Sequence, residues 1–175
     1  VPRCEVTGSV TLGGKTLQLQ KGQGWYDHEF GCPPANAPEK KAMTDHGTIA
    51  WNWVSLQLDD GTDVSVYDLV DTKDGSSAGK WAVTSDKSGH RYAFTDFTLE
   101  ATGEWRSVRT FHDYPTHWKL EIPEAKVSVQ IEAAFADQEL VTVLSKPAFW
   151  EGRAHATGTV SGKPATGLAY IERNG

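Results

Sequence analysis

The stretch Trp51-Asn52-Trp53-Val54-Ser55-Leu56-Gln57-Leu58 decides the fold class, because its side chains alternate between two kinds. A strand turns successive side chains to opposite faces, so the even-numbered aliphatic residues from Val54 to Leu58 share one face and need a core. The odd-numbered residues from Trp51 to Gln57 form a mixed face with two Trp and two hydrogen-bonding groups. That face suits either the wall of a ligand pocket or a covered outer surface.

Similar short runs recur along the whole chain, each bounded by Gly, Asp, Asn or Pro, and helix signals are almost absent. The turn dipeptides Gly13-Gly14, Asp60-Gly61, Asp74-Gly75 and Ser161-Gly162 indicate hairpins between them. This pattern predicts an all-β, antiparallel sheet or barrel in which sequence neighbours pair. The expected strands cover residues 4–11, 15–20, 23–30, 48–58, 63–70, 80–84, 93–100, 105–110, 117–121, 126–133, 139–145, 149–158 and 166–173.

Length and charge limit the possible classes of protein. A chain of 175 residues fits one domain, and no apolar run approaches the roughly 20 residues that span a bilayer. We therefore expect a single soluble domain over residues 1–175 without a membrane span. The formal net charge of −6 is spread along the chain and argues against nucleic acid as a partner.

Tryptophan is unusually frequent, with seven residues in the chain. Two explanations fit this number equally: core packing in a barrel, and the wall of a pocket for a large apolar ligand. The expected ligand-binding residues, aromatic or polar, are Trp25, Tyr26, Trp51, Asn52, Trp53, Gln57, Tyr67, Trp118 and Trp150.

The two cysteines, Cys4 and Cys32, allow one internal disulfide, and free buried thiols are the alternative. A strand entering at Cys4 and one leaving at Phe30 can be neighbours through the turn at Gly13-Gly14. A bridge would indicate an exported protein, periplasmic or secreted, whereas reduced thiols would be consistent with a cytoplasmic protein.

The segment Trp25-Tyr26-Asp27-His28-Glu29-Phe30-Gly31 is the richest in titratable groups. As a strand it places Trp25, Asp27 and Glu29 on one side and His28 on the other. Repulsion and burial would raise the pKa of one carboxyl and make a proton donor available near pH 7. A solvent-facing pair of ordinary acidity is the alternative. The Pro-rich residues 32–47 that follow form either a lid or a disordered connector.

Signatures of other chemistries are missing. The sequence has no Gly-x-Ser-x-Gly elbow, no phosphate-binding Gly loop and no His-Glu-x-x-His helix, and its six His are scattered. We therefore expect neither a metal nor a cofactor.

Six short motifs occur in an order that resembles the carotenoid 1,2-hydratase and AttH-like lipocalin-like family, also described as hydroxyneurosporene synthase-like. They are residues 25–31, Trp51-Asn52-Trp53 through Gly61, Tyr114-Pro115 with Trp118, Asp137-Gln138-Glu139, Trp150-Glu151-Gly152 and residues 167–172. The resemblance covers nearly the whole chain. It implies a lipocalin-like β-barrel that corresponds to the second half of a two-domain protein.

The resemblance also implies an enzyme for a hydrophobic, polyunsaturated small molecule, either a terpenoid or carotenoid or a polyketide. In alkene hydration, Asp27 or Glu29 would protonate the double bond, and the other carboxylate or His28 would direct water. In pericyclic cyclisation of the Diels–Alderase type, Asn52, Gln57 or Tyr67 would hydrogen-bond to an activating carbonyl. A carrier that binds an apolar ligand without turnover is the alternative.

If the strand of Trp51 and Trp53 faces outward, it exposes an aromatic surface that the first domain of the family would cover. We therefore expect a homodimer, or a separate N-terminal-half domain, over this face.

Overall fold

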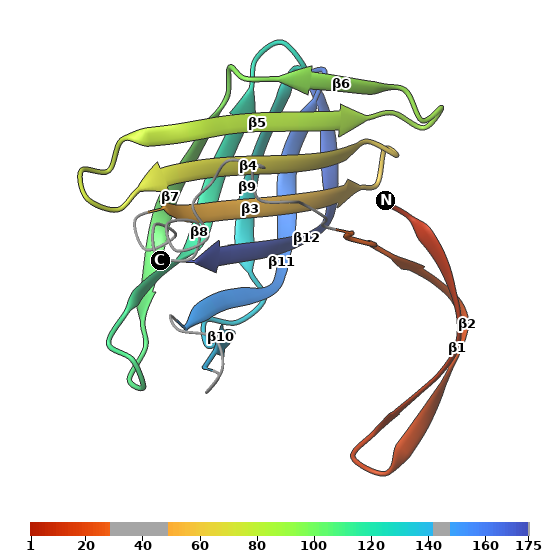
Figure 1. Cartoon of the computed structure of the whole chain (residues 1–175). Coiled ribbons are helices and arrows are strands. Elements are labelled where there is room, and N and C mark those ends of the chain that lie inside the picture. Colours follow the sequence, from red (N-terminus) through yellow and green to blue (C-terminus); the bar gives the residue numbers. More distant parts are fainter. Residues whose placement is uncertain (29–48, 142–147, 175) are drawn as a thin grey trace, which may run out of the picture. The chain divides into compact units, whose positions relative to one another are not determined.

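The computed structural model describes residues 1–28, 49–141 and 148–174. The chain divides into two compact units, residues 1–42 and residues 43–175. Figure 1 shows the first as a long hairpin in red and the second as a large curved sheet. The single domain over 1–175 stays a prediction.

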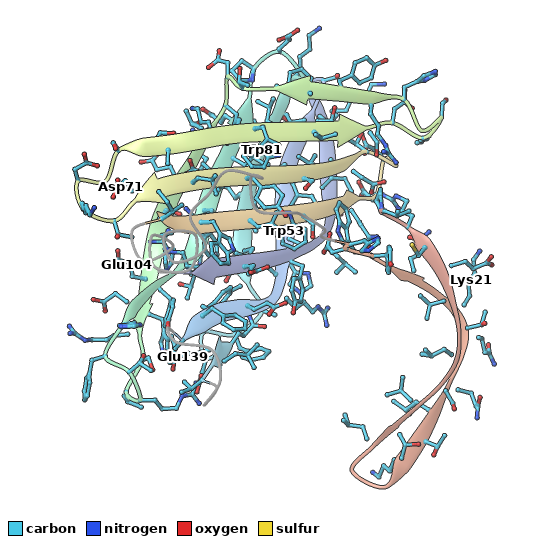
Figure 2. All side chains as sticks on the ribbon, in the orientation of Figure 1. Lys21, Trp53, Asp71, Trp81, Glu104 and Glu139 are labelled. Atoms are coloured by element: carbon cyan, nitrogen blue, oxygen red, sulfur yellow. The ribbon has the colours of Figure 1, made fainter. Side chains whose placement is uncertain are left out.

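The hairpin unit consists of β1 (Cys4–Leu12) and β2 (Lys15–Gly24), which pair antiparallel. Gly13 and Gly14 connect them with positive φ angles of 54° and 76°, the left-handed conformation that a two-residue hairpin turn requires. Side chains such as Lys21 project from both strands (Figure 2). The strand expected over 23–30 is wrong: β2 continues to Gly24, and residues 25–28 form no strand.

The second unit is one antiparallel sheet of ten strands. Nine lie in the order β6-β5-β4-β3-β12-β11-β9-β8-β7, and β10 pairs with β11 outside that path. Their bounds are β3 Ile49–Leu58, β4 Asp63–Asp71, β5 Ser77–Ser85, β6 Arg91–Phe94, β7 Thr98–Arg106, β8 Asp113–Ile122, β9 Val127–Ala133, β10 Glu139–Leu140, β11 Phe149–Val160 and β12 Lys163–Asn174.

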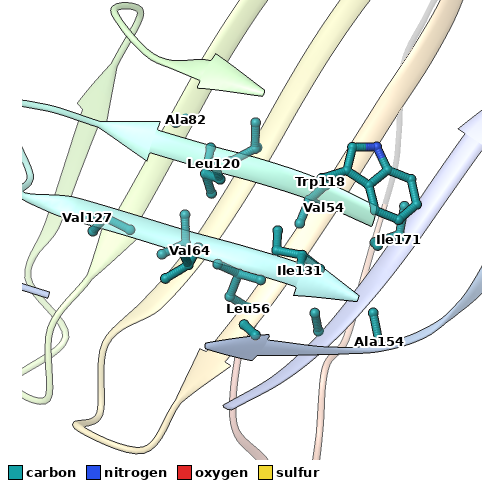
Figure 3. Packing of buried hydrophobic residues seen from close by; sticks show 14 of the residues in the cluster. Val54, Leu56, Val64, Ala82, Trp118, Leu120, Val127, Ile131, Ala154 and Ile171 are labelled. Atoms are coloured by element: carbon teal, nitrogen blue, oxygen red, sulfur yellow. The ribbon is translucent and has the colours of Figure 1, made fainter. Parts of the chain in front are cut away.

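Register and alternation place the core on one face of this sheet. Val54 lies opposite Val66, and Val66 opposite Ala82, so the buried residues of β3, β4 and β5 point the same way. Leu120 and Ile131 of β8 and β9 belong to the same cluster. Figure 3 shows this cluster enclosed between the two halves of the curved sheet. The sheet is therefore a half-barrel around one apolar interior.

The all-β, antiparallel prediction is confirmed, and the curved sheet is consistent with a lipocalin-like fold. In the described ranges no ladder joins the end strands β6 and β7, so the barrel is open there. Hairpin turns form at Asp60-Gly61, Asp74-Gly75 and Ser161-Gly162, as predicted.

Three strand predictions need correction. The strands expected over 93–100 and 105–110 do not match the observed strands, which are β6 (Arg91–Phe94) and β7 (Thr98–Arg106). The described part of 139–145 contains only the short strand β10. The reason is that β-prone residues lie on both sides of Thr95 and Asp96, where the chain crosses from one end of the sheet to the other. Within the described ranges, no helix has the length and apolar character needed to cross a bilayer.

Two glycines allow the long strands to approach closely where the sheet curves. A Cβ on Gly158 would overlap the carbonyl oxygen of Ser128 and lie 2.7 Å from the Cα of Val129. A Cβ on Gly167 would lie 2.8 Å from the Cα of Leu58. The obstacle is backbone in both cases, so the neighbouring strand itself would have to move.

We therefore expect Gly158→Ala or Gly167→Ala to lower the free energy of unfolding by about 2 to 3 kcal/mol, as overpacking does. Urea denaturation followed by tryptophan fluorescence measures the change. The matched control is Thr157→Ala on the exposed face of β11, expected to change stability by less than about 1 kcal/mol. Unchanged stability of Gly158→Ala would show that the strands separate at little cost.

Candidate functional site

Four polar residues lie directly opposite one another across neighbouring strands, in the register of the sheet. Arg173 of β12 is opposite Asn52 of β3, Asn52 is opposite Asp68 of β4, and Asp68 is opposite Lys80 of β5. Each lies two residues from a core residue of its strand, namely Ile171, Val54, Val66 and Ala82. The period of two therefore places this polar row on the same inner face as the core.

Hydrogen bonds connect the polar row. Arg173 Nη1 donates to Asn52 Oδ1 at 2.9 Å, and the side-chain amide of Asn52 donates to the carboxyl of Asp68. Lys80 Nζ donates to the backbone carbonyl of Phe97 at 2.7 Å and lies 5.0 Å from the centre of its ring. Asn52 thus separates the carboxyl of Asp68 from the guanidinium of Arg173.

A cavity of about 250 Å³ opens beside this row. Its lining combines Asp68 and Lys80 with the apolar Phe97 and Leu99 and with Ser77 and Thr98. A hydrophobic ligand with one or two polar groups suits such a lining.

Burial gives the row unusual electrostatics. Burial raises the pKa of Asp68, and this effect exceeds the opposing effects of the Asn52 hydrogen bond and of the charges on Lys80 and Arg173. Burial also lowers the pKa of Arg173. Arg173 Nε is buried and has no hydrogen-bond partner among the described residues.

The same register continues from Arg173 to Trp150 of β11 and from Trp150 to Glu139 of β10. The side chain of Glu139 is fully buried and accepts hydrogen bonds from Ser107 Oγ at 2.6 Å and Tyr114 OH at 3.0 Å. It also accepts from Thr110 Oγ1 and forms an ion pair with Arg109 at 3.1 Å.

These donors hold the pKa of Glu139 at about 2, because their stabilisation of the carboxylate outweighs the opposing effect of burial. Burial, together with the Glu139 charge, raises the pKa of Tyr114 to about 12. At neutral pH Glu139 is therefore an anion that ties the turn between β7 and β8 to β10, and Tyr114 keeps its proton.

Several predicted ligand-binding residues lie on the opposite face of the sheet from Asn52. Trp53 is only 5% exposed, donates from Nε1 to Ser65 Oγ at 3.2 Å and lies beside Tyr67, which stacks on Trp81 (Figure 2). Trp51, on the same side, donates to Glu172 at 3.0 Å.

The exposed aromatic side chains of the outer face are therefore not the expected Trp51 and Trp53. Trp53 is buried and Trp51 half-buried, whereas Trp81 and Tyr170 are 42% and 40% exposed. Gln57 also belongs to this outer face, and it is half-buried. A partner over the outer face stays a prediction.

Trp118 and Trp150 lie inside the core, with ring centres 5.9 Å apart. Trp150 Nε1 donates to the carbonyl of Ala136 at 2.7 Å.

The predicted catalytic residues fall in the hairpin unit or outside the described residues. Trp25 Nε1 donates to Asp27 Oδ1 at 2.8 Å, and the rings of Tyr26 and His28 lie 6.1 Å apart. The expected grouping of Trp25 with Asp27 is thus present without a strand. Tyr26, Asp27 and His28 are exposed.

Glu29 and Cys32 lie outside the described residues, so the carboxylate pair and the disulfide stay predictions. The half-buried thiol of Cys4 lies 3.4 Å from the carbonyl oxygen of Val1.

Sequence reasoning missed Asp68, Lys80 and Arg173. A signal for Asp68 was present, because it occupies a core-facing position of a predicted strand, two residues after Val66. A charged residue in such a position is costly unless it is paired or functional. Among the described residues no group of three or more His, Cys, Asp or Glu could hold a metal ion.

We expect Glu139→Gln to lower the free energy of unfolding by about 3 kcal/mol at pH 7, because the donors around it lose their carboxylate. The native pKa lies below the ordinary 4.5, so the carboxylate stabilises the fold above that pH. This contribution is lost as pH falls from about 4.5 through about 2. Urea denaturation at pH 7 and pH 3 should therefore show a smaller difference between the two proteins at pH 3. The control Glu132→Gln changes an exposed carboxylate and should have little effect. A difference that stays equal at both pH values would contradict this account of Glu139.

The AttH-like family model matches residues 1–175. Kievitone hydratase from Fusarium solani subsp. phaseoli is 26% identical over 184 residues, an alignment that covers 98% of this chain and 47% of that protein. The chain therefore spans about half the length of the curated relative it matches.

Two solved structures resemble the fold. A Nitrosomonas europaea protein described as an AttH superposes with a TM-score of 0.74 at 26% identity, over 99% of this chain and 50% of its own. Kievitone hydratase from Nectria haematococca has a TM-score of 0.70 at 22% identity, over 95% of this chain and 49% of its own. The family match over every residue and the shared fold lead to one conclusion: this chain belongs to the AttH-like family.

Proposed function

We propose that the chain is the whole or part of a hydratase that adds water across a carbon–carbon double bond of a hydrophobic small molecule, with Asp68 as the proton donor. The observation that carries the proposal is the position of Asp68, a half-buried carboxyl with a raised pKa beside a cavity whose lining includes Phe97 and Leu99 as well as polar residues. A carboxylic acid that keeps its proton nearer neutral pH is the group that protonation of an alkene needs.

In the proposed reaction the electron pair of the double bond takes the proton of the Asp68 carboxyl and forms a carbon–hydrogen bond. A water molecule then bonds through its oxygen to the neighbouring carbon. The proton that this water loses returns to the Asp68 carboxylate, so the net change is the addition of one water molecule. Asn52 orients Asp68 by donating a hydrogen bond to the carboxyl.

The relatives support this class of reaction, because two of them are named kievitone hydratase. They are about twice as long as this chain, so a further domain or another chain contributing to the site is compatible with the proposal.

Asp27, Glu29 and His28 form the rival proton-transfer group. Asp27 is exposed in the hairpin unit, whereas Asp68 is half-buried. The same set of variants therefore separates the two assignments.

We expect Asp68→Asn to lower the hydration rate at least about 100-fold, because the amide cannot donate the proton that general acid catalysis requires. Apolar alkenes are incubated with the protein, and mass spectrometry detects the gain of one water. The rate of the unmodified protein should fall as pH rises through the raised pKa of Asp68.

The matched control is Asp113→Asn, an exposed carboxylate whose change should leave the rate within about twofold. If Asp27→Asn or Glu29→Gln abolishes hydration while Asp68→Asn does not, the assignment to Asp68 is wrong. Binding of an apolar alkene without any conversion would instead identify a carrier.

A further inference from the structure

The inner face of the sheet carries more positive than negative charge around Asp68. Lys80 and Arg173 flank it in the polar row, and in the described part of the chain neither has a carboxylate within ion-pair distance. Each donates instead to a neutral oxygen, the Phe97 carbonyl for Lys80 and the Asn52 amide for Arg173. The charge of one carboxyl, Asp68, reaches both of them, so among the described residues two partly buried cations share a single anion, although the chain has a formal net charge of −6.

Partial burial of a charge is costly unless a counter-charge or several hydrogen bonds compensate it. Arg173 is incompletely compensated, since its Nε is buried without a partner. Lys80 lines the 250 Å³ cavity, so a ligand in that cavity can reach its ammonium group. The missing acceptor can therefore come from the ligand.

We infer that the ligand of this cavity is an apolar molecule carrying an acidic oxygen, a carboxylate or a phenol, which binds at Lys80 with Arg173 behind it. The apolar body contacts Phe97 and Leu99, which line the same cavity. This inference extends the proposed function. It rests on that function in one respect only, namely that the substrate of the hydration and the ligand inferred here occupy the same cavity.

The charges also restrict which alkenes fit. Protonation of an isolated double bond creates a carbocation, and two neighbouring cations would oppose that charge. Once Asp68 has given up its proton, its carboxylate balances one of these cations, and an anionic oxygen on the substrate balances the other. The acidic oxygen therefore serves both binding and the chemistry proposed for Asp68.

The test compares matched probes on the full chain by quenching of tryptophan fluorescence. The carboxylate pair is 4-phenylbutyrate with its uncharged alcohol, 4-phenylbutan-1-ol. The phenol pair is 4-propylphenol with its methyl ether, 4-propylanisole. We expect the acidic member of at least one pair to bind at least about tenfold more tightly than its neutral partner. The pair that shows the preference identifies the source of the oxygen.

Lys80→Met keeps the length of the side chain and removes its charge, and it should abolish most of that preference while leaving the neutral probes within about twofold. Lys80→Gln can retain a hydrogen bond to the Phe97 carbonyl, so it tests the charge alone if Lys80→Met fails to fold. Arg173→Met should also reduce the preference. The control Lys119→Met removes a lysine that pairs with Glu121, and it should leave the preference intact.

Equal affinity for acidic and neutral probes, no saturable binding of any probe, or a preference that survives both Lys80 variants would each overturn the inference. Hydration is measured separately. A protein that binds the acidic probes through Lys80 but hydrates no alkene would overturn the proposed function and leave this inference standing.

Discussion

The register of the antiparallel sheet is the constraint on which the rest of the structure depends. Because every strand alternates its faces, a single register places Val54, Val66 and Ala82 together in the core. The same register, two residues further along each strand, brings Asn52, Asp68 and Lys80 into line. A slip of one residue would move both sets to the outer face. Stability and the candidate site are therefore fixed by the same hydrogen-bond ladders.

The close approaches at Gly158 and Gly167 belong to this constraint. Each glycine lies opposite a core residue of the neighbouring strand, Val129 and Leu58, at the end of the sheet away from the polar row. Tight packing there closes the apolar interior around β-branched and leucine side chains. At the other end the residues are charged, so the interior opens into a cavity with polar groups on its wall. The asymmetry of the half-barrel follows from which residues occupy its inner positions.

Much of the fold could be predicted from the sequence, whereas of the candidate site only Asn52 was predicted. Alternation in β3 and the turn at Asp60-Gly61 are local signals, so strand identity and hairpin pairing were accessible. The pairing of β3 with β12 joins residues more than a hundred positions apart, and it alone brings Arg173 to Asn52. Local reasoning also gave weight to residues 25–31, where titratable groups are adjacent in sequence. Burial, which decides whether such groups change their acidity, depends on tertiary packing.

Glu139 and Asp68 lie in one row of paired positions across the sheet, yet the pKa values of their carboxyls shift in opposite directions. Glu139 is reached by side-chain donors from Ser107, Thr110, Tyr114 and Arg109, and its pKa falls to about 2. Asp68 has one side-chain donor, Asn52, and burial raises its pKa. The first carboxyl is thereby fixed as an anion that anchors a turn, and the second is left able to hold a proton and release it. Environments that separate two acidities in this way are a physical basis for assigning roles to paired acids.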